Sequence, residues 1–123
     1  MNRSEVLSLA GQWNVEHDAI TSLLNNSDSI ACRFLHAVQI GKSNAVHSCD
    51  LQRILNTDHR TIEDIAFRLR TIGFPIIGNN AGYYAASDLD EGKECFNLLY
   101  NRAMSTLKSL DRIHETLEKE GCV

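Results

Sequence analysis

The chain has 123 residues, 43% of them hydrophobic and 23% charged, with a formal net charge of −4. This length fits one domain with a core and one or two accessory helices, and the apolar content excludes a mainly disordered chain. There is no apolar run of about 18 residues and no hydrophobic stretch behind the N-terminal residues, so we expect a cytoplasmic protein without a membrane span or secretion signal.

Catalytic and metal-binding patterns are missing from the sequence. The four cysteines, at positions 32, 49, 95 and 122, form no Cys-x-x-Cys pair, and their spacing to the histidines matches no zinc site. We find no phosphate-binding loop, no Gly-x-Ser-x-Gly and no paired histidines. We therefore expect reduced thiols, no cofactor and no metal, in a protein that is not an enzyme.

The N-terminal region, residues 1–26, reads as a helical extension. Apolar residues recur at helical spacing over 4–24, which predicts one helix or two short helices separated near Gly11, with Ser4 as a candidate N-cap. A polar run over 25–28 then interrupts the pattern. A further helix is predicted from Ser29 to Ile40, where Gly41 supplies the stop, and it opens a domain that we place at 27–87.

Two more helices and a hairpin follow in this domain. After a possible short strand over 45–47, Ser48 can cap a helix that buries Leu51, Ile54 and Leu55. Asp58 is suited to cap the next helix, which Gly73 ends and Pro75 prevents from continuing. Its apolar residues recur at spacings of three and four and are Ile62, Ile65, Ala66, Leu69 and Ile72.

The segment after Pro75 predicts a small antiparallel hairpin. Two apolar runs, 76–77 and 83–85, flank a connection over 78–82 made of residues that tolerate positive φ. One of the two adjacent tyrosines, Tyr83 or Tyr84, should face the core because neighbours in a strand point to opposite faces. Helix, turn, helix and hairpin in this order predict a winged helix-turn-helix.

A family resemblance supports this fold over roughly residues 30–86. The residues that carry it are Thr57-Asp58-His59-Arg60-Thr61-Ile62, Asp64-Ile65, Leu69-Arg70 and Gly73-Phe74-Pro75-Ile76. They resemble the biotin-repressor-like winged-helix modules of bacterial regulators, and small phage-encoded winged-helix proteins show a similar pattern. The resemblance implies a mainly α fold with a small β-hairpin. In this fold the first turn of the domain's third helix, the one that Asp58 caps, contacts DNA.

Candidate DNA contacts follow from that placement. Arg60 at the helix start is able to bond a guanine edge, and the hairpin offers amides and a hydroxyl for phosphates or the minor groove. The candidate DNA-binding residues are His59, Arg60, Thr61, Arg68, Asn79, Asn80 and Tyr83. The competing interpretation is that these candidates are ordinary surface or turn residues. In addition, Glu63 occupies a position where regulators of this family commonly have a basic residue.

The charge distribution argues against a simple DNA-binding domain. Residues 45–86 carry four arginines and four acidic residues and are neutral, while 1–44 carry −1 and 87–123 carry −3. Nucleic-acid binders usually show a basic excess on the binding face.

The C-terminal segment, 88–123, predicts one long helix from Asp88 to about Glu120. An apolar stripe at heptad spacing marks candidate dimerisation residues, namely Phe96, Leu99, Ala103, Leu107, Leu110, Ile113 and Leu117. Pairing of two copies as a coiled coil and folding back onto the N-terminal helix of the same chain are equally compatible with this stripe.

We therefore expect a bacterial or phage winged-helix regulator of transcription or replication that binds double-stranded DNA as a homodimer. The alternative is an acidic winged-helix module, such as a phage-encoded inhibitor or antirepressor, whose partner is a host protein. The zero net charge of residues 45–86 favours this alternative.

Overall fold

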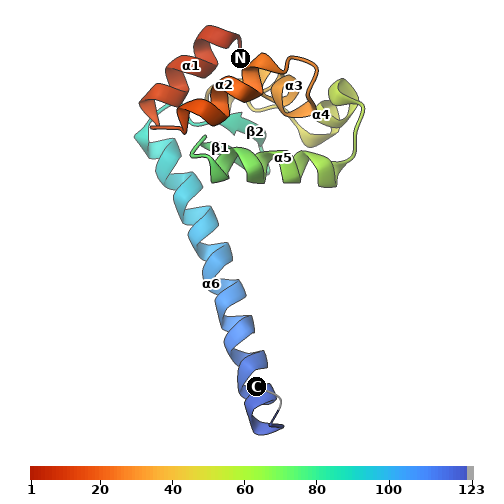
Figure 1. Cartoon of the computed structure of the whole chain (residues 1–123), viewed down its shortest axis with the longest axis vertical. Coiled ribbons are helices and arrows are strands. Elements are labelled where there is room, and N and C mark those ends of the chain that lie inside the picture. The colour runs from red at the N-terminus through yellow and green to blue at the C-terminus, as the bar shows by residue number, and fades with distance from the viewer. Residues whose placement is uncertain (122–123) are drawn as a thin grey trace.

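The computed structural model describes residues 1–121 and confirms a mainly helical fold with a two-stranded hairpin and a long C-terminal helix. Helices α1 to α5 share one core with one face of the hairpin, the first turns of α6 pack on its other face, and the rest of α6 runs away from this body (Figure 1). The elements in chain order are α1 (Arg3–Gln12), α2 (His17–Asn25), α3 (Ile30–Ala37), η1 (Lys42–Asn44), α4 (Ser48–Leu55), α5 (His59–Thr71), β1 (Ile76–Asn79), β2 (Gly82–Ala85) and α6 (Leu89–Lys119).

Side-chain caps set the starts of several helices. The predicted cap of α5 is confirmed, since the Asp58 carboxylate accepts a hydrogen bond from the Thr61 amide at 2.8 Å. Asp88 caps α6 in the same way. The expected cap at Ser4 is wrong because Asn2 caps α1 with a reciprocal bond to Glu5, and Ser48 is the first residue of α4 rather than its cap.

The N-terminal region forms two helices, and they separate just after Gly11, which is the next-to-last residue of α1. The chain turns over residues 13–16, where Asn14 adopts a φ of 53° that asparagine tolerates better than most residues. The Glu16 amide then donates a hydrogen bond to the Ile72 carbonyl at 3.2 Å. This bond ties the connection between α1 and α2 to the end of α5.

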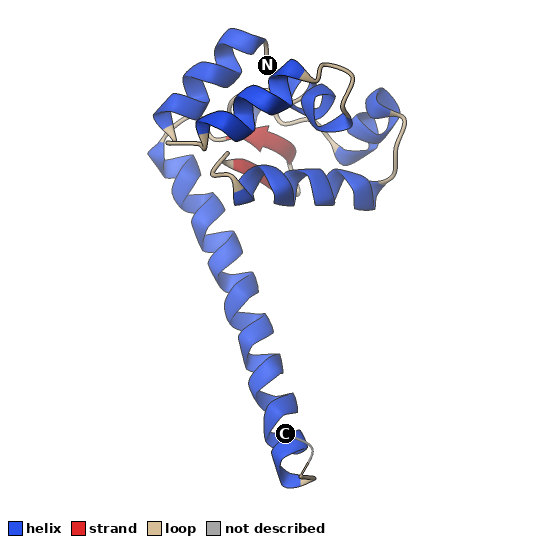
Figure 2. Ribbon diagram, in the orientation of Figure 1, coloured by secondary structure: helices blue, strands red, loops and turns tan. Residues whose placement is uncertain are grey.

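The hairpin is tighter than the sequence predicts. Ile76 pairs with Ala85 and Asn79 with Gly82, so a two-residue turn replaces the expected five-residue connection (Figure 2). The expected strand over 45–47 is reduced to a single bridge between Val46 and Tyr83. A Cβ on Gly82 would lie 2.5 Å from the Val46 carbonyl oxygen, so this bridge requires glycine.

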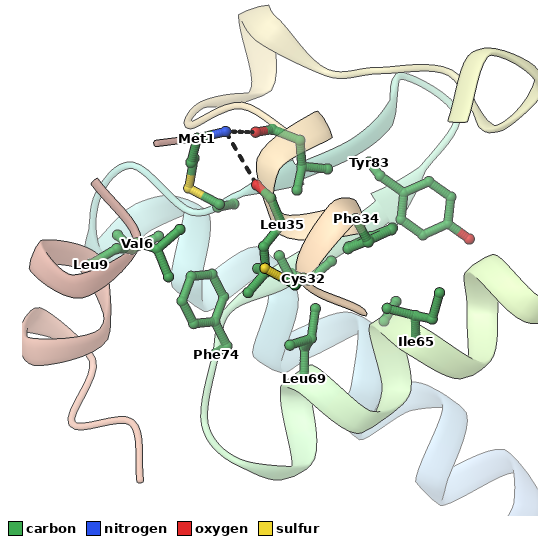
Figure 3. Packing of buried hydrophobic residues seen from close by; sticks show 14 of the residues in the cluster. Met1, Val6, Leu9, Cys32, Phe34, Leu35, Ile65, Leu69, Phe74 and Tyr83 are labelled. Carbon is green, nitrogen blue, oxygen red and sulfur yellow. Dashed lines mark hydrogen bonds between the residues drawn. The ribbon is translucent and has the colours of Figure 1, made fainter. Parts of the chain in front are cut away.

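One hydrophobic core joins the N-terminal helices to the winged region. Side chains from α1, α3 and α5 meet around Phe34 and Phe74 (Figure 3). The Met1 amine donates hydrogen bonds to the carbonyls of Leu35, His36 and Val38 at 3.1, 3.0 and 2.7 Å, next to the C-terminal end of α3. Residues 1–26 are therefore packed into the same body as residues 27–87.

The prediction for Ile54 is wrong, and the prediction that one of the two tyrosines faces the core is confirmed by Tyr83, although the second tyrosine is buried as well. Ile54 is 53% exposed because α4 turns only Leu51 and Leu55 toward the core. Both tyrosines of β2 are buried, since Tyr83 packs edge-on against Phe34 and Tyr84 belongs to a second cluster at the base of α6. The two faces of this hairpin are thus both covered.

Within residues 1–121, helix α6 packs against the body through its first turns. Gly92 lies against Trp13, and Cys95 and Leu99 pack against the cluster that includes Ile77 and Tyr84. From Tyr100 to Gly121 every residue is exposed. The expected alternative in which this helix folds back onto α1 is therefore wrong. Within residues 1–121, no helix combines the length and apolarity that a membrane crossing requires.

Candidate nucleic-acid interface

An open groove of about 660 Å³ runs along one side of α5. We call it the α5–hairpin groove. The start of α4 and the first turn of α5 form one end, the hairpin tip forms a wall, and α6 contributes Arg102. The groove therefore brings together segments that are separated by up to about half of the chain.

A chain of hydrogen bonds connects α4 to α5 at one end of the groove. Gln52 donates to the Ser48 hydroxyl at 3.1 Å, and this hydroxyl lies 2.8 Å from His59 Nδ1. His59 Nε2 lies 2.9 Å from a Glu63 carboxylate oxygen. The Glu63 carboxylate can only accept hydrogen bonds, whereas the Ser48 hydroxyl can donate or accept them, so the two ring nitrogens of His59 face different kinds of partner.

The Ser48, His59 and Glu63 side chains are the types found in hydrolase triads, but their setting differs. The side chains of His59 and Glu63 are 57% and 60% exposed, so water screens the electrostatic activation that a buried triad provides. The network instead holds the first turn of α5 against α4. It also occupies both ring nitrogens of His59, which was a predicted DNA contact.

Arg70 also lines the groove. Its Nε donates to the Ile76 carbonyl at 2.6 Å, and the Cys95 thiol donates to the same oxygen at 3.7 Å. Burial lowers the pKa of Arg70 from its usual value and raises that of the Cys95 thiol. Arginine nevertheless keeps its charge, so Arg70 places a fixed positive charge where α5, β1 and α6 meet.

The predicted contacts on α5 are split between two sides of the helix. Arg60 is exposed on the outer face and makes no hydrogen bond or ion pair with any residue in 1–121, which leaves its guanidinium available. Thr61 is half-buried in the first turn, and Arg68 is exposed but does not line the groove. Arg70, two residues further, takes the groove position instead.

The predicted contacts on the hairpin all line the groove. Asn79 is used by the turn, since it donates to the Tyr84 hydroxyl at 3.2 Å and accepts from the Ala81 amide at 2.9 Å. Asn80 is exposed at the tip. Tyr83 is only 7% exposed, and burial raises the pKa of its hydroxyl.

Two positive charges, two negative charges and one exposed aromatic ring decide the chemistry of this groove. Arg70 and Arg102 are balanced by Glu63 and Asp64, so the lining is neutral when its histidines are neutral. Phe67 is 68% exposed in the middle of α5 and also lines the groove. The predicted DNA-binding residues do not include Phe67, Arg70 or Arg102, which line the groove. For Phe67 the sequence does hold a signal, because it breaks the polar face of an amphipathic helix.

Comparison with known proteins finds no matching family model, no similar curated protein and no similar solved structure.

Proposed function

We propose that this protein binds double-stranded DNA through α5 and the hairpin, as a winged-helix regulator of transcription or replication in the cytoplasm of a bacterial cell. One observation carries the proposal: α5 presents an uncommitted arginine, Arg60, in its first turn, and the same turn shares the α5–hairpin groove with the hairpin tip through His59. Helix-turn-helix proteins insert the N-terminal residues of the second helix into the major groove in this way.

The neutral lining makes the proposed binding weak for a single copy. Each phosphate that a cation neutralises releases counterions, and Glu63 and Asp64 oppose this gain at the groove. Arg60 is separated from this region by one turn and supplies the direct contact, worth about 1–3 kcal/mol if it reads a base bidentately. The proposal therefore predicts binding that is strongest at low salt.

The test is fluorescence polarisation with labelled duplexes at low salt. Arg60→Ala should weaken binding, whereas Arg3→Ala should not, because it removes an equal charge from the exposed side of α1. Glu63→Gln should tighten binding by removing a repelling charge. Absence of duplex binding by the wild-type chain, or equal affinity of the Arg60→Ala and Arg3→Ala variants, would refute the proposal.

A second function is favoured by the ring of Phe67. A large aromatic side chain that is mostly exposed at the centre of a neutral face is typical of a protein interface, where aromatic residues anchor the partner. In this case the chain is an interaction module, such as a phage-encoded inhibitor of a host protein. Phe67→Ala would then abolish capture of a partner protein, while Arg60→Ala would leave that capture intact.

A further inference from the structure

The free part of α6 exposes an apolar face that no part of residues 1–121 covers. Six large side chains at helical spacing form it, and each is between 40% and 65% exposed: Phe96, Tyr100, Leu107, Leu110, Ile113 and Leu117. We call them the apolar face of α6. Phe96 and Tyr100 stack on each other with ring centroids 5.8 Å apart, so the face begins with an aromatic step next to the body.

A lone helix of this kind is poorly stable in water. Isolated helices of up to about 15 residues are marginal, and most helices in proteins depend on packing of an apolar side. Here α6 is 31 residues long, and it has contacts with the body only through its first turns. The remaining turns, from Tyr100 onward, have no packing on the body, so a surface that covers their apolar side would stabilise them.

We infer that a second copy of this chain covers the apolar face of α6, so that two α6 helices pair along their free length. The exposed fractions, applied to side chains of roughly 200 Å², correspond to about 650 Å² per copy. Two copies would then bury about 1,300 Å², which lies within the range of stable interfaces.

Charge and spacing also fit a second copy. From residue 100 to 120, four basic residues are balanced by four acidic ones, so two such helices do not repel each other. This balance gives no attraction for a phosphate backbone or an anionic membrane surface. Phe96, Leu110 and Leu117 are separated by multiples of seven residues, and a heptad repeat is the pattern that matches a partner with the same repeat.

Leu99 and Ala103, which the sequence groups with this face, take different roles in the pairing. Leu99 packs against the body beside Cys95 and Tyr84, and it therefore fixes α6 rather than meeting a partner. Ala103 is exposed between the aromatic step and Leu107. A small side chain there lets two helices approach closely.

The pairing is tested by the mass of the intact chain in solution without nucleic acid, so its result is independent of the proposed DNA binding. Light scattering on a sizing column should give twice the 13.8 kDa of one chain. Leu110→Glu should raise the dissociation constant by on the order of 100-fold, since the charge enters the interface from both copies. Ser105→Glu adds the same charge to the opposite side of α6 and should change it by less than about threefold.

Circular dichroism on dilution gives a second readout. If pairing stabilises α6, dilution of the wild-type chain should lower the helical signal, while Trp13 fluorescence reports that the body stays folded. A mass of one chain at all concentrations with undiminished helicity would overturn the inference. So would a Leu110→Glu variant that pairs as well as the Ser105→Glu variant.

Discussion

The contact between Gly92 and Trp13 fixes the direction in which α6 leaves the body, and Gly92→Ala tests it. Gly92 is the fourth residue of α6, and its amide donates to the carbonyl of the Asp88 cap at 3.1 Å. An added Cβ would lie 2.1 Å from Cη2 of the indole and about 3 Å from two further ring atoms. Carbon atoms that are not bonded normally approach only to about 3.5–4.0 Å.

Two opposing free energies decide the sign of the effect. Replacing glycine by alanine inside a helix stabilises a protein by up to about 1 kcal/mol, because alanine has less backbone freedom to lose. Forcing an extra carbon into a packed contact costs about 1–3 kcal/mol. The clash of 2.1 Å involves the rigid indole ring rather than a flexible side chain, so the cost dominates. We expect a net destabilisation of about 1–2 kcal/mol.

A double-mutant cycle separates the two contributions. In a Trp13→Ala background the colliding ring is absent, so Gly92→Ala should become stabilising by about 0.5–1 kcal/mol. The measurement is urea unfolding followed by circular dichroism at one protein concentration, because association would couple to stability. Gly11→Ala is the matched control, since a Cβ there meets nothing within 4 Å and should stabilise in both backgrounds.

The result that contradicts this prediction is an equal effect of Gly92→Ala on the free energy of unfolding with and without the indole. Equal values would mean that α6 does not rest on Trp13. The indole Nε1 is itself buried without a hydrogen-bond partner among residues 1–121, so packing alone holds this ring against the helix.

Three further predictions concern the hairpin, the cap of α5 and its exposed face. Gly82→Ala should destabilise the protein by about 2 kcal/mol or more in urea unfolding, because φ is +118° and the Cβ would meet the Val46 carbonyl. Hydrogen bonds to Thr61 lower the pKa of Asp58 below 3.8, so its stabilisation is present above that pH and declines as pH falls through the folded-state value. Asp58→Asn should flatten this part of the acid unfolding curve, and an unchanged curve would contradict it. Phe67→Ala should alter the free energy of unfolding by less than about 0.5 kcal/mol because the ring is exposed, and a larger loss would show that it packs on the body.

Local chemistry was sufficient to predict the middle of the fold. The Asp58 cap, the apolar spacing of α5 and the stop at Gly73, which has a φ of +100°, are each decided by neighbouring residues. For the same reason the order of α4, α5 and hairpin was predictable. A helix cap could not be predicted where two equally good candidates lie a few residues apart, as the choice of Asn2 over Ser4 illustrates.

Features that depend on contacts between distant segments could not be predicted from the sequence. The outer edge of the hairpin is paired by Val46, more than 30 residues earlier in the chain, which bonds Tyr83. Both tyrosines are buried because α3 covers one face and the base of α6 covers the other. Strand alternation alone assumes that one face is open to solvent.

The same limit applies to the groove. Arg70 and Arg68 are equivalent in sequence terms, and only the position of the Ile76 carbonyl selects Arg70 as the residue that faces the hairpin. Arg102 reaches the groove only because α6 leaves the body beside α5. Neither choice follows from periodicity, since both depend on how the body is assembled.

The joint at Gly92 also couples the two proposed surfaces. Arg102 lines the α5–hairpin groove, while Tyr100, half a turn earlier, belongs to the apolar face of α6. Residues two apart in a helix point to different sides, so a partner helix on the apolar face runs beside the groove without filling it. Pairing would thus hold two reading helices on one rigid frame, and two weak sites joined in this way bind a duplex far better than either alone. Neutral grooves are then sufficient for binding, and a Leu110→Glu chain should lose most of its DNA affinity although every groove residue is unchanged.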